Sequence, residues 1–176
     1  VLRELHVLPD SLLRVSRAGS PGSAPGVLED YGHVVVAFAW LAAVTRDPGW
    51  FDAAVALTRT MVTQFHDDTG FADTAVDAEP LVRRPRDPSD NAYPSGTAAA
   101  AAALITMASL SGDQEWRNLA DETLAALAEL QRDHPRFAGW SLAALAAARN
   151  GPTEVAIVTG PDDDGGDLLR AAVRHG

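Results

Sequence analysis

Apolar residues recur at steps of three and four along much of the chain, which is the spacing of one helix face. The first such stretch predicts a helix over Leu28–Thr45, with Glu29 and Asp30 in its first turn, where acids favour the helix dipole. Pro48 suits the first turn of a second helix, which runs to about His66. Together the two stretches predict a helical hairpin over residues 28–66.

The same pattern returns further along the chain. A helix over Ser95–Leu110, which includes six consecutive alanines, is followed by a helix from Asp113 to about Arg132. Both bends have the frame Asp-x-x-Trp-x-x-x-Ala, at Asp47, Trp50 and Ala54 and again at Asp113, Trp116 and Ala120. The match predicts a second hairpin over residues 95–132 and indicates an internal repeat.

The rest of the chain predicts shorter elements. An extra helix is expected over Arg136–Arg149, and a strand-helix tail over residues 153–174. In this tail the β-branched run Glu154–Gly160 is typical of a buried strand, and Asp167–Arg174 forms the helix. Prolines keep Asp67–Asp90 from forming a helix. Short strands are candidates within Leu12–Arg17, Phe71–Thr74 and Pro80–Arg83.

A hairpin of this length with a long return loop is larger than the repeat of tetratricopeptide type. It suits hairpins set around an axis, so we expect a mainly α fold, a partial α/α toroid with a small β element near the C-terminus. The inner helices, Leu28–Thr45, Ser95–Leu110 and Arg136–Arg149, would run the same way and open their N-termini at one mouth. We expect residues 1–176 to be a single domain and, since the chain starts at Val1, a fragment of a longer toroid.

The composition narrows the classes of function. The net charge is −10 and all fourteen basic residues are arginine, so the clustered positive charge that binds nucleic acid is missing and no such partner is expected. The chain has no cysteine, which excludes disulfides, thiolate zinc sites and a cysteine nucleophile. No apolar run reaches the roughly 18 residues of a membrane span, and no signal peptide is recognised. We therefore expect no membrane partner and a cytoplasmic location.

Metal and cofactor sites are not predicted. The five histidines show no ligand spacing along the chain. Asp162–Gly166 resembles a calcium loop, but Val173 stands at the twelfth position, where such a loop carries an acid. We therefore expect no metal and no cofactor.

Two polar clusters fall at equivalent places in the repeat. They are Glu29-Asp30-Tyr31 and the segment Asp90–Gly96. Asp30 and Asp90 are the candidate catalytic pair, because glycoside cleavage uses two carboxylates: one protonates the leaving oxygen, and the other activates water or attacks carbon. The alternative for both acids is a structural role in capping helices or bracing loops.

The other polar residues of the clusters are candidates for substrate binding: Glu29, Tyr31, Asn91, Tyr93 and Ser95. The two tyrosines, the only ones in the chain, can stack on a sugar ring or simply pack with a bonded hydroxyl. Ser95 suits an N-cap better than a nucleophile, because no Ser-His-Asp order supports the second role. The free N–H groups at the inner-helix N-termini suit a carboxylate, a sugar or a phosphate.

The two clusters also carry a resemblance to a known family. Leu28-Glu29-Asp30-Tyr31-Gly32 resembles a family segment Leu-Asp/Glu-Asp-Tyr-Ala, and Asp90–Thr97 resembles Asp-Gly-Ala-x-Pro-Ser-Gly-Asn, departing from it at Asn91 and Thr97. Leu110–Asp113 and Glu154–Val158 fit as well. On these residues the chain is similar to the thioredoxin-domain-containing YyaL / spermatogenesis-associated protein 20 family.

The resemblance implies both a fold and a function. Members join an N-terminal thioredoxin-like domain to an (α/α)6-type toroid, similar to six-hairpin glycosidases and N-acylglucosamine 2-epimerases. We therefore expect this chain to bind or process a carbohydrate at the mouth, as a relative of glycoside hydrolases or sugar epimerases. The alternative is a non-catalytic interaction scaffold attached to a thioredoxin-like domain in the full-length protein. Without cysteine, no thiol redox chemistry resides in this part of it.

Overall fold

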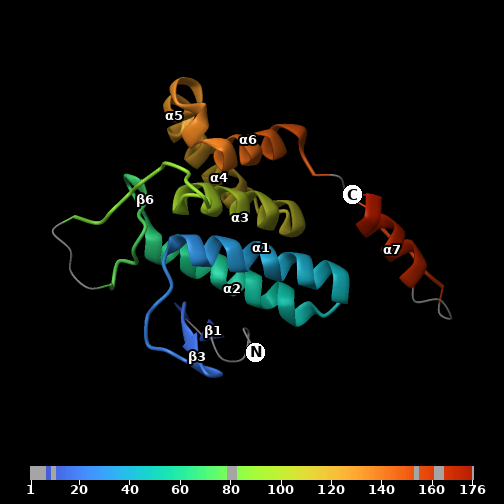
Figure 1. The fold of residues 1–176 in the computed structure, drawn as a ribbon. Helices are drawn as coiled ribbons and strands as arrows, with labels where there is room; N and C mark the ends of the chain where they lie inside the picture. Colours follow the sequence, from blue (N-terminus) through green and yellow to red (C-terminus); the bar gives the residue numbers. More distant parts are fainter. Residues whose placement is uncertain (1–6, 9–10, 79–82, 153–154, 161–164, 176) are drawn as a thin grey trace.

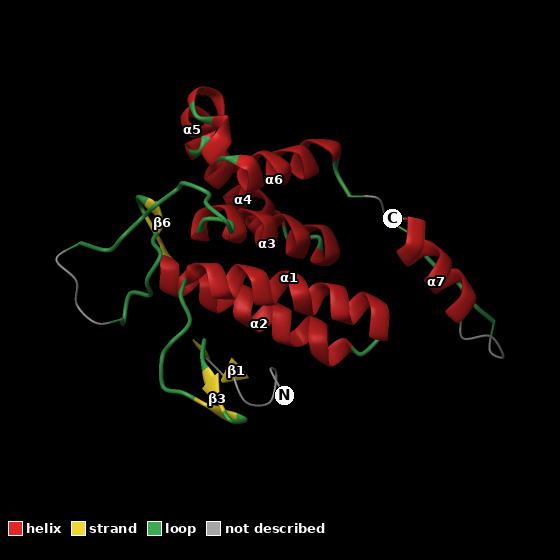
Figure 2. Ribbon diagram, in the orientation of Figure 1, coloured by secondary structure: helices red, strands yellow, loops and turns green. Residues whose placement is uncertain are grey.

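The computed structural model describes residues 7–8, 11–78, 83–152, 155–160 and 165–175. The helices within these ranges are α1 (Leu28–Thr45), α2 (Pro48–Phe65), α3 (Gly96–Ser111), α4 (Gln114–Ala126), α5 (Ala128–Asp133), the 3₁₀ helix η2 (Pro135–Phe137), α6 (Gly139–Asn150) and α7 (Gly166–His175). The strands in the same ranges pair as short antiparallel hairpins: β1 (Val7–Leu8) with β2 (Ser11–Leu12), β3 (Ser16–Arg17) with β4 (Ser20–Pro21), and β5 (His66–Asp67) with β6 (Gly70–Phe71). Figure 2 shows how far helix predominates, and the mainly α prediction is confirmed.

The central helices form two layers. Figure 1 shows α1, α3 and α6 running the same way, with α2 and α4 returning behind them. α3 packs against both α1 and α6, and the hairpins α1–α2 and α3–α4 are each closed by contacts between their own helices. α1, α3 and α6 therefore correspond to the parallel helices that the repeat predicts, and their N-termini lie at one end. The partial α/α toroid stays a prediction.

Small side chains allow α1 and α3 to approach closely. A Cβ atom placed on Gly32 of α1 would lie 2.7 Å from the carbonyl carbon of Ala99 in α3, so no larger residue fits without movement. Ala100, Ala101 and Ala103 of α3 are completely buried, because helices pack around this face. Larger apolar side chains complete the core on either side: Val35, Phe38, Leu57, Met61, Phe65, Leu104 and Met107.

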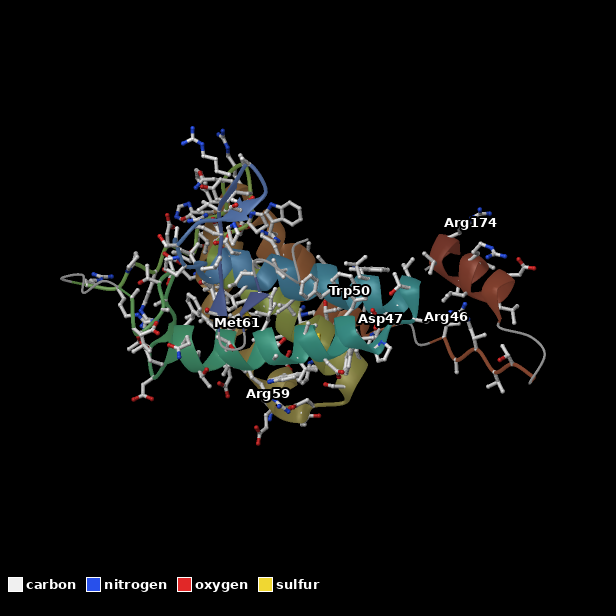
Figure 3. The ribbon with its side chains drawn as sticks, turned by 90° about the horizontal axis from the view of Figure 1, so that it is seen from below. Arg46, Asp47, Trp50, Arg59, Met61 and Arg174 are labelled. Atoms are coloured by element: carbon white, nitrogen blue, oxygen red, sulfur yellow. The ribbon has the colours of Figure 1, made fainter. Side chains whose placement is uncertain are left out.

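The repeated Asp-x-x-Trp frame marks the start of the second helix in each hairpin. Asp47 accepts the N–H of Gly49 at 2.9 Å, and Asp113 accepts two N–H groups of the next turn at 2.9 and 3.1 Å. The ring of Trp50 lies 5.0 Å from that of Phe38 between centroids, and Figure 3 shows Asp47 and Trp50 at this bend. Both aspartates are thus N-caps, which is why the frame recurs.

Two helices differ from their predicted lengths. α4 ends early because Leu127 donates its N–H to the carbonyl of Leu124, at 3.2 Å, which tightens the turn before α5 begins. α6 begins at Gly139, after η2, and not at the predicted Arg136. The carbonyl of Phe137 in η2 accepts the N–H of Asp90 at 2.8 Å, so it is turned toward a loop.

The strand predicted over Glu154–Gly160 is wrong for the residues described there, 155–160, which form no strand; residues 153–154 lie outside the described ranges. A strand requires a neighbouring backbone for its hydrogen bonds, and no described segment pairs with this one. Val155 and Val158 are correspondingly 60% and 89% exposed. The helix of the predicted tail is present as α7, which stands apart from the two layers in Figure 1.

The β element predicted near the C-terminus is therefore absent from the described residues, and the β structure that they contain lies earlier in the chain. The Leu12–Arg17 candidate contains parts of β2 and β3, and the Phe71–Thr74 candidate shrinks to the end of β6. The Pro80–Arg83 candidate falls largely outside the described residues. The long segment between α2 and α3 otherwise carries no regular structure where it is described, as its prolines predict.

Candidate functional site

The N-termini of α1 and α3 meet at a cavity of about 240 Å³. The segment between α2 and α3 passes over this end of the helices, as Figure 1 shows. The cavity is lined by Val27, Glu29, Asp73, Thr74, Asp87, Ser89, Asn91, Tyr93, Pro94, Ser95 and Gly96. Four of the predicted site residues, Glu29, Asn91, Tyr93 and Ser95, are thus brought together, as the register of the repeat predicts. Among the described lining residues, none is cationic.

Asp73 is the most constrained acid of this cavity. Its backbone carbonyl accepts the N–H of Leu28 at 3.0 Å, and its own N–H donates to the carbonyl of Pro85 at 2.9 Å. The carboxylate Oδ2 accepts the N–H of Asp87 at 3.1 Å. The other oxygen, Oδ1, lies 3.2 Å from where a Cβ on Gly96 would stand, so a larger residue there would require a small movement of the Asp73 side chain. Asp73 therefore lies beside the first turns of both α1 and α3.

Burial raises the pKa of the Asp73 carboxyl above its ordinary value of 3.8, and the nearby charge of Asp87 adds to this effect. The hydrogen bond from the Asp87 N–H and the positive charge of Arg86 act in the opposite direction but are outweighed. Asp73 is thus better suited than an exposed aspartate to hold and donate a proton. No sequence pattern marks Asp73 as a site residue, because it lies in an irregular segment and outside both polar clusters.

Glu29 brings a second carboxylate to the cavity from the first turn of α1. Its Oε1 pairs with Arg14 Nη2 at 3.2 Å, and the same guanidinium reaches Asp30 Oδ2 from Nε at 3.2 Å. The Glu29 side chain is 27% exposed, so it remains open to a ligand. Arg14 therefore balances the two acids at the start of α1.

Asp30 itself does not line the cavity. Its Oδ2 accepts the backbone N–H of Val27 at 2.9 Å, which satisfies a donor at the start of α1. The Asp30 carboxylate also contacts Arg14, so its interactions are with neighbouring parts of the protein. The capping alternative considered for Asp30 is therefore present in the structure, whereas its catalytic assignment stays a prediction.

Asp90 also has a structural position, at the joint between α3 and α6. Its side chain is buried, Oδ1 accepts the N–H of Ser95 at 2.9 Å, and Oδ2 accepts the N–H of Trp140 at 2.8 Å. Both carboxylate oxygens are thus engaged by backbone donors at two helix N-termini. Asp90 braces the cavity wall next to Ser95 but does not line the cavity; its catalytic role stays a prediction.

The two tyrosines have different surroundings. Tyr31 is buried, its hydroxyl oxygen accepts the N–H of Leu12 at 2.8 Å, and its ring packs at 5.0 Å from that of Phe65. Burial raises the pKa of the Tyr31 phenol, which lines a separate cavity near the N-terminal hairpins. Tyr93 is 60% exposed at the rim of the candidate site. The packing alternative therefore describes Tyr31, and Tyr93 is the tyrosine available for stacking.

Ser95 and Asn91 complete the part of the site that precedes α3. Ser95 is buried, and its Oγ accepts the N–H of Ala98 at 3.2 Å, which confirms the predicted N-cap. Asn91 is exposed, and its backbone N–H donates to the Tyr93 carbonyl at 3.1 Å. This turn leaves the Asn91 side chain free to face solvent or a ligand.

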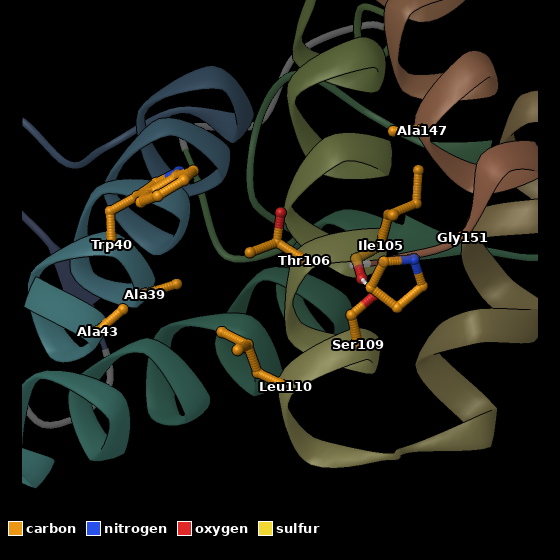
Figure 4. A pocket seen from close by; sticks show the side chains of 10 residues that line it. Ala39, Trp40, Ala43, Ile105, Thr106, Ser109, Leu110, Ala147 and Gly151 are labelled. Atoms are coloured by element: carbon orange, nitrogen blue, oxygen red, sulfur yellow. Dashed lines mark hydrogen bonds between the residues drawn. The ribbon is translucent and has the colours of Figure 1, made fainter. Parts of the chain in front are cut away.

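A second cavity, of about 270 Å³, lies between α1, α3 and α6 toward their C-terminal ends (Figure 4). Trp40, 58% exposed, stands at its α1 side. Among the described residues around it, the polar side chains are Thr106 and Ser109, whose hydroxyls donate to carbonyls of the preceding turn at 2.9 and 2.8 Å. The lining is therefore mainly apolar.

Within the described residues, no group of three or more acids and histidines is placed to hold a metal ion. None of the described helices has both the length and the apolar character that crossing a membrane requires. No protein-family model matches the chain, and a search of curated proteins finds no match. The family resemblance drawn from the residues therefore stays a prediction.

Proposed function

We propose that the cavity at the N-termini of α1 and α3 binds a small carbohydrate, with Asp73 and Glu29 as its two acids. The observation that carries this proposal is the position of Asp73, a partly buried carboxyl of raised pKa in one cavity with Glu29, Asn91 and Tyr93. These side chains can all contact a hydroxyl-rich ligand. Carboxylates accept hydrogen bonds from hydroxyls, an amide both donates and accepts, and an aromatic ring covers the apolar face of a sugar.

The size and charge of the cavity limit the ligand. Its volume of about 240 Å³ falls below the roughly 300–1,000 Å³ of sites for drug-sized molecules, so it fits about one sugar ring. Its described lining carries three carboxylates, Glu29, Asp73 and Asp87, and no cation. A phosphorylated or carboxylated sugar would meet like charge here. A neutral sugar is therefore the favoured ligand.

The two acids differ in a way that suits glycoside cleavage. Asp73 retains its proton to higher pH because of burial, so it is the candidate to protonate a leaving oxygen. Glu29 is paired with Arg14 and is the candidate to act as carboxylate on water or carbon. Asp30 and Asp90, the pair first suggested by the sequence, then support the site by fixing the starts of α1, α3 and α6.

The family resemblance, which depends on sequence motifs and not on the cavity, supports the same proposal. It implies an (α/α)6-type toroid, in which this cavity would open at the mouth formed by inner-helix N-termini. The parallel course of α1, α3 and α6 is in keeping with such a ring. In the full-length protein, the proposal includes an attached thioredoxin-like domain.

A second candidate function is an interaction scaffold without catalysis. The observation that favours it is the apolar cavity between α1, α3 and α6, with Trp40 58% exposed and Leu110 52% exposed beside it. Exposed apolar surface of this kind is typical of contact with another chain or domain. The two functions use opposite ends of the same helices and can be tested separately.

Calorimetric titration with a panel of neutral monosaccharides and disaccharides tests the carbohydrate proposal. The wild-type protein should bind at least one of them, and Asp73→Asn should lower the affinity by about tenfold or more, because the amide cannot reproduce the hydrogen bonds of the carboxyl to sugar hydroxyls. Asp52→Asn, an exposed change on α2, is the control and should leave affinity unchanged. Asp30→Asn and Asp90→Asn should lower thermal stability more than affinity. The absence of binding to every sugar would refute the proposal.

A further inference from the structure

Two arginines of the segment that returns to α3 meet a single carboxylate beside β5. Arg84 Nη1 lies 3.2 Å from Asp67 Oδ2, and the guanidinium of Arg86 pairs with the same oxygen. Both arginines are mostly buried, at 25% and 22% side-chain exposure. Hydrogen bonds from Thr69 first, and then Arg86, hold the pKa of Asp67 well below its usual range. The Asp67 carboxylate is therefore charged whenever the protein is folded near neutral pH.

The same arginines also bind backbone carbonyls on the other side of the segment. Arg84 donates from Nε to the Thr74 carbonyl and from Nη2 to the Gln64 carbonyl, each at 3.1 Å. Arg86 donates from Nη1 to the Gly70 carbonyl. Each guanidinium thus bonds both the Asp67 carboxylate and at least one neutral backbone carbonyl in or beside the β5–β6 hairpin. The returning segment is fastened to the end of α2 and to this hairpin.

The residues next to these arginines are the ones that cover Asp73. The carbonyl of Pro85, between Arg84 and Arg86, accepts the Asp73 N–H at 2.9 Å. Asp87, directly after Arg86, donates its N–H to Asp73 Oδ2 at 3.1 Å. The contacts of the arginines therefore determine where Pro85 and Asp87 stand relative to the acid.

We infer that Asp67, Arg84 and Arg86 form a clamp that holds residues 85–87 over Asp73 and so positions the acid of the carbohydrate cavity. The clamp lies outside that cavity, since none of its three residues lines it. The inference depends on the proposed function only in naming Asp73 as the working acid. The contacts themselves are independent of any ligand.

Release of the clamp has a predictable consequence for Asp73. Its burial is the largest cause of its raised pKa, and the charge on Asp87 acts in the same direction. The other charged groups facing it are Arg86 on the returning segment and Glu29 in the shared cavity. If residues 85–87 move away, Asp73 gains water and loses the neighbouring carboxylate. Its pKa then falls toward that of an exposed aspartate.

The experiment measures the Asp73 carboxyl by carbon-detected NMR titration in the ligand-free chain. Asp67→Asn and Arg84→Gln should each lower its pKa and speed hydrogen exchange at the Asp87 amide by about tenfold or more. Arg83→Gln is the matched control: it removes the same charge from the neighbouring position. Arg83 is exposed and makes no hydrogen bond or ion pair with the described part of the chain. In the Arg83→Gln variant, the Asp73 pKa and the hydrogen exchange rate of the Asp87 amide should equal those of the wild type.

Two results with the variants would overturn the clamp. One is an unchanged Asp73 pKa in both folded variants; the other is an equal shift in Arg83→Gln. The wild-type protein gives a further test that needs no variant, because the clamp predicts a slowly exchanging Asp87 amide although Asp87 is an exposed residue. Exchange there at the rate of a free loop would also contradict it. Failure of every sugar to bind would refute the proposed function but leave these measurements valid.

Discussion

The Asp90 carboxylate accepts the backbone N–H of Trp140 at 2.8 Å, across 50 positions of sequence. Its second oxygen accepts the N–H of Ser95, so one buried side chain joins the N-termini of α6 and α3. This joint fixes the relative height of two parallel helices at the end where the cavity lies. Asp90, which the sequence suggested as a catalytic residue, thus has a structural position beside the cavity.

Replacement of Asp90 by alanine should cost about 2–4 kcal/mol of unfolding free energy, because two backbone donors lose a charged acceptor inside the protein. Chemical denaturation measures the change. Asp52→Ala is the control, since Asp52 is exposed on α2 and alanine favours helix; its effect should stay within about 0.5 kcal/mol. A similar stability for both variants would show that the joint contributes little.

Replacement of Gly32 by alanine should destabilise the protein by about 1–3 kcal/mol, although alanine is normally the better helix former. The added methyl would lie 2.7 Å from the Ala99 carbonyl carbon and force α1 and α3 apart. Gly139→Ala, in the first turn of α6, offers the comparison, because nothing lies within 4 Å of the position that its added methyl would take. Thermal denaturation should show a loss for the first variant and none for the second. Equal melting temperatures would contradict the close contact.

Replacement of Tyr31 by phenylalanine should cost about 1–2 kcal/mol, since the buried N–H of Leu12 loses its acceptor. The phenol also gives a pH signature. Its pKa is raised above 10.0 in the folded state, so the stability that it contributes is present below that pH and is lost as the pH rises through the folded value. Denaturation curves at rising alkaline pH should therefore converge for the two proteins. Tyr93→Phe, at an exposed position, should change neither quantity.

Asp73 should make the unfolding free energy depend on pH in the acidic range, whereas Tyr31 acts in the alkaline range. Its folded pKa is raised above the ordinary 3.8, so the unfolded chain releases this proton first as the pH rises. The contribution to stability is therefore greatest below 3.8 and falls as the pH rises through the folded value. Unfolding free energies of wild type and Asp73→Asn, compared across acidic pH, should differ by an amount that changes in this window. A constant difference would indicate an Asp73 that titrates as an exposed residue.

The helical hairpins could be predicted because their signals are local. Pro48, the aspartate caps and the three- and four-residue apolar steps act within one or two turns, and the predicted Leu28–Thr45 helix has the observed bounds. The strand predicted over Glu154–Gly160 failed for the opposite reason. Its β-branched composition favours extended backbone, but a strand also requires a partner, which composition does not reveal.

The site was predictable only in part. The repeat register placed Glu29 and Ser95 at equivalent helix starts, and both line the cavity. Asp73 could not be found in this way, because its burial depends on hydrogen bonds with Pro85 and Asp87 in a segment without regular structure. Contacts between irregular segments leave no periodic pattern in a sequence.

The most direct test of the carbohydrate proposal is an amide NMR titration of the wild-type protein with the saccharide panel. The proposal predicts saturable shifts at Glu29, Asn91 and Ser95 around the cavity, and in Asp73→Asn their saturation should require at least about tenfold more sugar. No saturable shifts with any sugar, or shifts confined to the apolar surface near Trp40 and Leu110, would contradict it.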